Sequence, residues 1–125
     1  RDEKQVPRCN TTGDTAAGIE GEGEGKSSVK CVAIDNIVMD TNVSFIKMDV
    51  EGAELRALSG AKHIITRDMP VLAISAYHKI DDLITLPQYI RSLAANGHSY
   101  QLYLRHHGCV ATELVLYAIP CTCER

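Results

Sequence analysis

Hydrophobic positions after about residue 28 fall into two kinds of pattern, short apolar runs and segments with a helical period. Apolar side chains that recur at three- and four-residue spacing from Ala53 to Ile65 predict an amphipathic helix. A second helix is expected to begin near Thr85, because Pro87 is tolerated only in a first turn, and to end at Asn96-Gly97. The apolar runs predict strands over residues 29–34, 43–48, 71–77, 100–104 and 112–119.

The order of these elements predicts an α/β fold. From residue 43 onward it is strand, helix, strand, helix, strand, strand, which is typical of a mostly parallel sheet with crossover helices and a final antiparallel hairpin. The almost wholly apolar run 71–76 favours a strand covered on both faces. Two crossover helices need more strands than the chain supplies, so we expect half of a doubly wound domain.

The first 28 residues have a different composition from the rest. Residues 11–28 are mostly Gly, Glu, Thr, Ser and Ala, with Ile19 as the one large apolar side chain. We therefore expect a flexible connecting segment over 1–28, the folded half-domain over 29–120 and a tail over 121–125. The glycines of this segment do not predict a dinucleotide-binding loop, because no strand pattern is seen before them and the interleaved glutamates would repel a phosphate.

Composition and charge exclude several classes of protein. The chain has 125 residues, one domain or less, and 13 Lys and Arg against 16 Asp and Glu give a net charge of −3. A nucleic-acid binder with a basic surplus is therefore not expected. No apolar run reaches the roughly 18 residues of a membrane span, and no secretory signal is visible. Five scattered cysteines do not resemble a disulfide framework, so we expect a reducing, cytoplasmic location.

Polar side chains gather where the expected parallel strands end. Ligands of open α/β sheets bind beyond the carboxyl ends of the strands, so residues at this edge are candidates for chemistry. An antiparallel last strand would begin at the same edge. The candidates are Asp49 and Glu51 after the second strand, His78 after the third, Arg105 and His106 after the fourth, and Glu113 at the start of the last.

Each candidate also has a structural interpretation that the sequence leaves open. Asp49 and Glu51 suit capping of the helix that follows, since carboxylates favour helix N-termini. His78 suits a turn in which Asp81 or Asp82 is its partner. The histidines at 106 and 107 suit solvent exposure in a hairpin loop.

The residues around the second strand resemble a known family. The segment Phe45-Ile46-Lys47-Met48-Asp49-Val50-Glu51-Gly52-Ala53-Glu54-Leu55, followed by Leu58-x-Gly60-Ala61, resembles the signature of the FkbM-type S-adenosylmethionine-dependent methyltransferases. The resemblance extends from about Thr11 to Ile119. It includes the segments 32–35, 70–75, 77–79 and 103–107.

The resemblance implies a Rossmann-like class I methyltransferase fold, a seven-stranded sheet whose last strand is antiparallel. The chain is expected to be the C-terminal half of that domain, from the fourth strand onward. The glycine-rich turn and the acidic strand end that hold most of S-adenosylmethionine belong to the first half. They are expected upstream of this chain.

The resemblance also implies O-methyl transfer to a hydroxyl of a small molecule, sugar or lipid. His78 is the candidate base, and Asp49 and Glu51 would position the acceptor or orient His78, with Asp49 also contacting the cofactor. Arg105, His106 and Glu113 would bind the acceptor. A divalent metal held by Asp49, Glu51 and His78 is not expected but stays open. The alternative functions are a non-catalytic Rossmann-like interaction module and a metal-dependent hydrolase. Separately, strand 43–48 is expected to be an exposed edge of the sheet, through which the protein could form oligomers.

Overall fold

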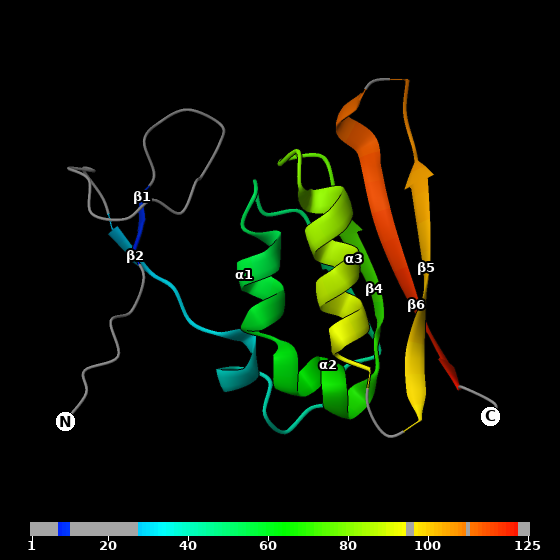
Figure 1. Cartoon of the computed structure of the whole chain (residues 1–125). Helices are drawn as coiled ribbons and strands as arrows, with labels where there is room; N and C mark the ends of the chain where they lie inside the picture. The colour runs from blue at the N-terminus through cyan, green and yellow to red at the C-terminus, as the bar shows by residue number, and fades with distance from the viewer. Residues whose placement is uncertain (1–7, 11–27, 95–96, 110, 123–125) are drawn as a thin grey trace.

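The computed structural model describes residues 8–10, 28–94, 97–109 and 111–122. Two sheets lie within these ranges (Figure 1). In the smaller sheet, β1 (Arg8–Asn10) pairs antiparallel with β2 (Ser28–Lys30). Residues 11–27, which make up most of the expected connecting segment, lie outside the described residues, and so do Asn96 and residues 123–125.

The larger sheet has four strands in the order β3-β4-β6-β5. β3 (Phe45–Met48) pairs in parallel with β4 (Val71–Ser75), and β6 (Leu114–Thr122) lies antiparallel between β4 and β5 (His98–His106). This topology confirms the expected α/β class, with parallel strands followed by an antiparallel hairpin. It is consistent with part of a Rossmann-like fold, in which β3 is an edge strand of the described sheet.

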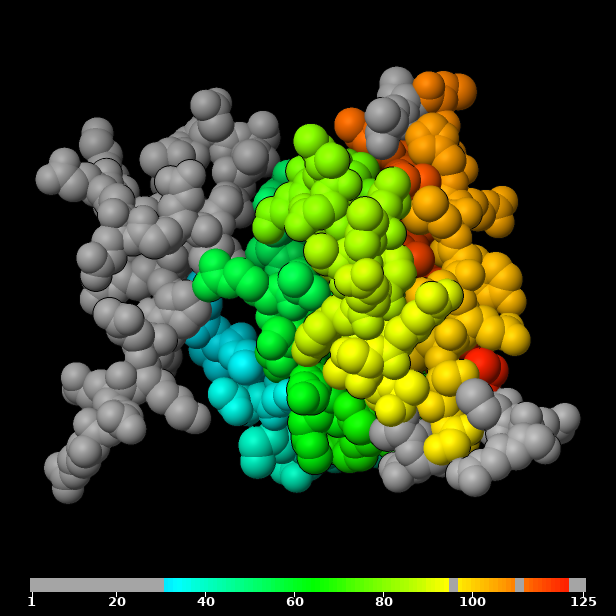
Figure 2. All heavy atoms as spheres, viewed as in Figure 1, coloured from blue at the N-terminus to red at the C-terminus, as the bar shows by residue number. Residues whose placement is uncertain are grey.

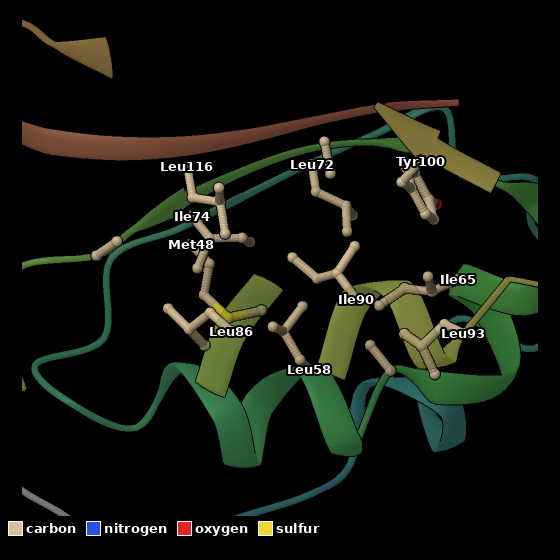
Figure 3. Packing of buried hydrophobic residues seen from close by; sticks show 13 residues of the cluster. Met48, Leu58, Ile65, Leu72, Ile74, Leu86, Ile90, Leu93, Tyr100 and Leu116 are labelled. Carbon is tan, nitrogen blue, oxygen red and sulfur yellow. The ribbon is translucent and has the colours of Figure 1, made fainter. Parts of the chain in front are cut away.

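Three α-helices pack on one face of this sheet: α1 (Glu54–Ser59), α2 (Lys62–Asp68) and α3 (Asp82–Ser92). Figure 3 shows the apolar layer between the helices and the strands. Its side chains include Met48, Leu58, Ile65, Leu72, Ile74, Leu86, Ile90, Leu93, Tyr100 and Leu116. Residues 72–76 are all buried, in agreement with their continuous apolar run. No described helix has the length and apolar character of a membrane-spanning helix.

The expected strand over 29–34 is wrong in extent. Only its start belongs to β2, and Ile34–Asn36 form a short 3-10 helix, η1. The reason is a long-range contact of Asp35. Its carboxylate accepts the backbone N–H groups of His63 and Ile64, both at 2.9 Å, so Asp35 caps the start of α2 from 28 residues away.

The single helix expected from Ala53 onward is divided into α1 and α2 at Gly60-Ala61. The carbonyl of Gly60 accepts the backbone N–H of Asp35 at 2.8 Å. Because η1 bonds both the end of α1 and the start of α2, the two segments do not continue as one helix.

Two element boundaries also differ from the prediction. α3 begins at Asp82 rather than Thr85, so Pro87 lies inside the helix. The buried carboxylate of Asp82 accepts the N–H of Lys79 at 2.8 Å and stabilises this earlier start. β5 extends to His106, so Arg105 and His106 belong to a strand and not to the hairpin loop.

Candidate active site

Two loops meet at the carboxyl ends of β3 and β4. After β3, Glu51 and Gly52 form a turn in which both residues are left-handed, with φ values of 51° and 86°. A Cβ atom on Gly52 would lie 3.2 Å from Lys79 Cε and 3.7 Å from His78 Cβ, so the loop after β4 passes directly over this glycine. The parallel pairing of β3 and β4 therefore brings the two loops into contact, as expected from the order of the strands.

Asp49, Glu51 and His78 form a cluster in these loops. The Nε2 atom of His78 lies 3.5 Å from Oδ1 of Asp49 and 3.5 Å from Oε2 of Glu51. The His78 side chain is 10% exposed, whereas the two carboxylates are 44% and 45% exposed. The imidazole therefore lies beneath two acidic groups that face solvent, and both of its ring nitrogens are buried.

Glu54 is a fourth member of the cluster that the sequence analysis did not select. It is buried, and its Oε1 lies 2.8 Å from His78 Nδ1 and accepts the N–H of Val50 at 3.1 Å. The other oxygen, Oε2, has no hydrogen-bond partner among the described residues. A buried carboxylate is costly unless it is compensated, so the contact with the imidazole is the main electrostatic compensation available to Glu54.

In the structure, other carboxylates make the helix-capping and turn contacts that the sequence left open for Asp49, Glu51 and His78. Ala53 is the N-cap residue of α1 and makes no side-chain cap, and the carboxylate bonded to a backbone amide at this helix start is Glu54. In the turn after β4, the bonded carboxylate is Asp82, which accepts from Lys79 rather than from His78. Asp49, Glu51 and His78 are thus directed toward one another.

Tyr77 is the second residue that the sequence analysis missed. Its hydroxyl lies 3.3 Å and 3.5 Å from the two carboxylate oxygens of Asp49, and its ring centroid lies 4.1 Å from that of His78. Burial, followed by the charge of Asp49, raises the pKa of the Tyr77 phenol. The hydroxyl therefore keeps its proton at neutral pH and donates to Asp49, which holds that carboxylate in place.

The three expected acceptor-binding residues lie on the hairpin. Arg105 pairs in register with Val115 and His106 with Leu114, and both side chains are exposed. Because β6 lies between β4 and β5, these two residues are two strands away from the strand that leads to His78. The Glu113 carboxylate is directed at the backbone of Gly108.

An apolar hollow of about 240 Å³ lies between α3 and the β5–β6 hairpin. In Figure 2, atoms of β6 are visible between those of α3 and those of β5. The hollow is lined by Ala76, Leu83, Pro87, Arg91, Leu102, Leu104 and Leu116. Ala76 is two residues before His78, but the hollow includes no member of the acidic cluster.

Comparison with known proteins identifies the family. Residues 4–106, which include the whole acidic cluster, match the methyltransferase FkbM domain. The chain belongs to the FkbM methyltransferase family. No curated protein matches this FkbM domain. Among solved structures it is similar to the crystal structure of methyltransferase FkbM from Methylobacillus flagellatus KT, with 45% sequence identity and a TM-score of 0.63.

The similarity to that structure covers 73% of this chain and 23% of the other chain. The domain described here thus spans less than a quarter of that relative. In the family match over residues 4–106, Arg105 and His106 are the last two residues, and Glu113 lies beyond its end.

Proposed function

We propose that this FkbM domain is the acceptor-activating part of an S-adenosylmethionine-dependent methyltransferase that methylates a hydroxyl group. The observation that carries the proposal is the cluster of Asp49, Glu51, Glu54 and His78 at the carboxyl ends of β3 and β4. This is the edge at which open α/β sheets bind ligands. Membership of the FkbM family supports methyl transfer as the reaction.

S-adenosylmethionine supplies an electrophilic methyl group on a positively charged sulfur when it is bound. The residues present fit one part of this cofactor, since the carboxylates of the cluster and the unpartnered Oε2 of Glu54 match a positive charge. Asp49, at the end of β3, is the proposed contact. Within the described residues no glycine-rich turn follows a strand to hold the methionine and ribose parts, so other residues of the protein must supply those contacts.

The chemistry that this cluster contributes is alignment and proton removal. In an O-methyl transfer, the new C–O bond forms as the C–S bond breaks, and the hydroxyl loses its proton. His78 is the proposed acceptor of that proton, because its buried Nε2 faces the exposed side of the cluster. Asp49 and Glu51 each have a carboxylate oxygen 3.5 Å from Nε2 and would hold the acceptor hydroxyl.

The acceptor is a small molecule, sugar or lipid with a free hydroxyl. Arg105, His106 and Glu113 are the proposed contacts for its more distant polar groups, since the hairpin that carries them ends at the same edge. We place the protein in the cytoplasm, with the half-domain at 29–120 between a connecting segment and a short tail. The edge of β3 is the proposed site of any oligomer contact.

The test uses the full-length protein and labelled S-adenosylmethionine with a panel of hydroxyl acceptors. Asp49→Asn and His78→Ala should each abolish transfer. Asp49→Asn should leave the melting temperature nearly unchanged, whereas His78→Ala should lower it, because the variant also leaves the buried Glu54 carboxylate without its imidazole partner. His63→Ala is the control, because His63 is exposed on α2 and lies outside the cluster. Comparable loss of folding in both cluster variants would favour a structural role for these residues, and full activity of either would refute the proposed role.

A further inference from the structure

We propose that Asp49, Glu51 and His78 bind a divalent cation. Nitrogen or carboxylate oxygen atoms of the three side chains all lie within 4.8 Å of one another. Donor atoms at such separations can share one ion at the roughly 2.0–2.6 Å that divalent metals require. The binding site rests on these contacts alone. Only its role in catalysis rests on the proposed function.

The strongest support comes from the orientation of His78. The ring is nine-tenths buried, and neither ring nitrogen makes a well-aligned hydrogen bond to a described residue. Nδ1 lies beside the buried carboxylate of Glu54, at 2.8 Å, so Nε2 is directed at the two exposed carboxylates. A carboxylate beside one ring nitrogen and a vacant second nitrogen is the usual arrangement of a metal-binding histidine.

Charge gives the second argument. Three carboxylates surround one imidazole, and one of them, Glu54, is fully buried. A single positive charge on the ring leaves this group strongly negative. A divalent cation between Asp49, Glu51 and Nε2 offsets the charge and gives Nε2 a partner.

The donor set favours Mg²⁺ or Mn²⁺. Two carboxylate oxygens and one imidazole nitrogen form a mixed, mainly oxygen site, and no cysteine takes part. Asp49 and Glu51 are each almost half exposed, so the remaining coordination positions face solvent. A hydroxyl acceptor bound at such a position would lose its proton more readily. With the cation bound, Nε2 of His78 is a ligand and no longer takes the proton, which would pass to a solvent water at the exposed side of the site.

Mn²⁺ binding to the 125-residue chain tests the site, with electron paramagnetic resonance used to count free ions. We expect one ion per chain. The double variant Asp49→Asn/Glu51→Gln should weaken binding at least about 100-fold, and Glu54→Gln about 10- to 100-fold, because it removes only the charge beside Nδ1. Asp40→Asn, which changes an exposed carboxylate before β3, is the matched control and should bind as the unaltered chain does.

Two results would overturn the site: no Mn²⁺ bound at millimolar concentration, or equal binding by the double variant and the unaltered chain. Thermal denaturation of each variant without metal shows whether it has folded. Methyl transfer by the full-length protein with and without a chelator separates the two proposals. Transfer that survives chelation, without Mn²⁺ binding, refutes the cation and keeps the function, whereas Mn²⁺ binding without any transfer does the reverse.

Discussion

Truncation of Leu58 to alanine tests how the helices are attached to the sheet. Leu58 lies on α1 with an exposed fraction of 0%, in the apolar layer that also contains Met48, Leu86 and Ile90 (Figure 3). Leu→Ala changes in protein cores cost about 2–5 kcal/mol, and the cost rises with the volume of the cavity that remains. Because a strand and a second helix both border this site, we expect little collapse and a loss of about 3–4 kcal/mol.

Such a loss is large for a domain of this size. Stabilities of about 5–15 kcal/mol are usual, and 1 kcal/mol shifts the melting temperature of a domain of up to 100 residues by about 4–8 °C. Leu58→Ala should therefore lower the melting temperature by about 12 °C or more. Urea and thermal unfolding followed by circular dichroism measure both quantities.

Leu55 provides a matched control on the same helix. It is 38% exposed, so Leu55→Ala removes the same atoms from a partly solvated position and should cost less than about 1 kcal/mol. Equal losses of stability in the two variants would show that the assigned face of α1, and with it the packing of the helix on the sheet, is wrong.

Three further predictions concern charge and cofactor binding. Hydrogen bonds from Arg67 and from the Val43 amide lower the pKa of Asp68 to about 2. The stabilisation by Asp68 is therefore present above about pH 4 and is lost as the pH falls toward 2. Asp68→Asn should flatten this part of an acid unfolding curve. Burial raises the pKa of Tyr100 to about 12, so the stability that it contributes is lost between about pH 10 and 12, and an ultraviolet titration of the folded chain should lose its latest-ionising tyrosine in Tyr100→Phe. Isothermal titration of the chain alone with S-adenosylmethionine should show no appreciable binding, and micromolar affinity in a monomer would contradict our placement of most of the cofactor site outside these residues.

Local patterns predicted the parts of the fold that depend on local physics. The helical period from Ala53 and the apolar run from Val71 to Ala76 follow from one-sided and two-sided burial, and both are found in the structure. The parallel pairing of β3 and β4 then brings the residues after the two strands together, so the meeting of Asp49 and His78 follows from topology.

Contacts between distant segments account for most of what the sequence did not show. Asp35 appears in the sequence as the end of a strand, but its carboxylate bonds α2 across 28 residues, and no local pattern indicates this. The position of Pro87 predicted that α3 starts near Thr85. The helix instead starts at Asp82, whose buried carboxylate accepts the N–H of Lys79. Glu54 carried one usable signal, its place three residues after Glu51, but only the structure shows that it is buried against His78.

The turn at Glu51 has a consequence for how this domain can be stabilised. Its φ of 51° is a conformation that costs an ordinary side chain about 1–2 kcal/mol and costs glycine almost nothing. Directed evolution for heat resistance would therefore favour Glu51→Gly. The same substitution removes one of the two carboxylates beside the imidazole. A thermostability screen should therefore select glycine at position 51, and an activity screen should select glutamate. The unfavourable backbone conformation of Glu51 is tolerated because it keeps a carboxylate beside His78 that folding alone does not require.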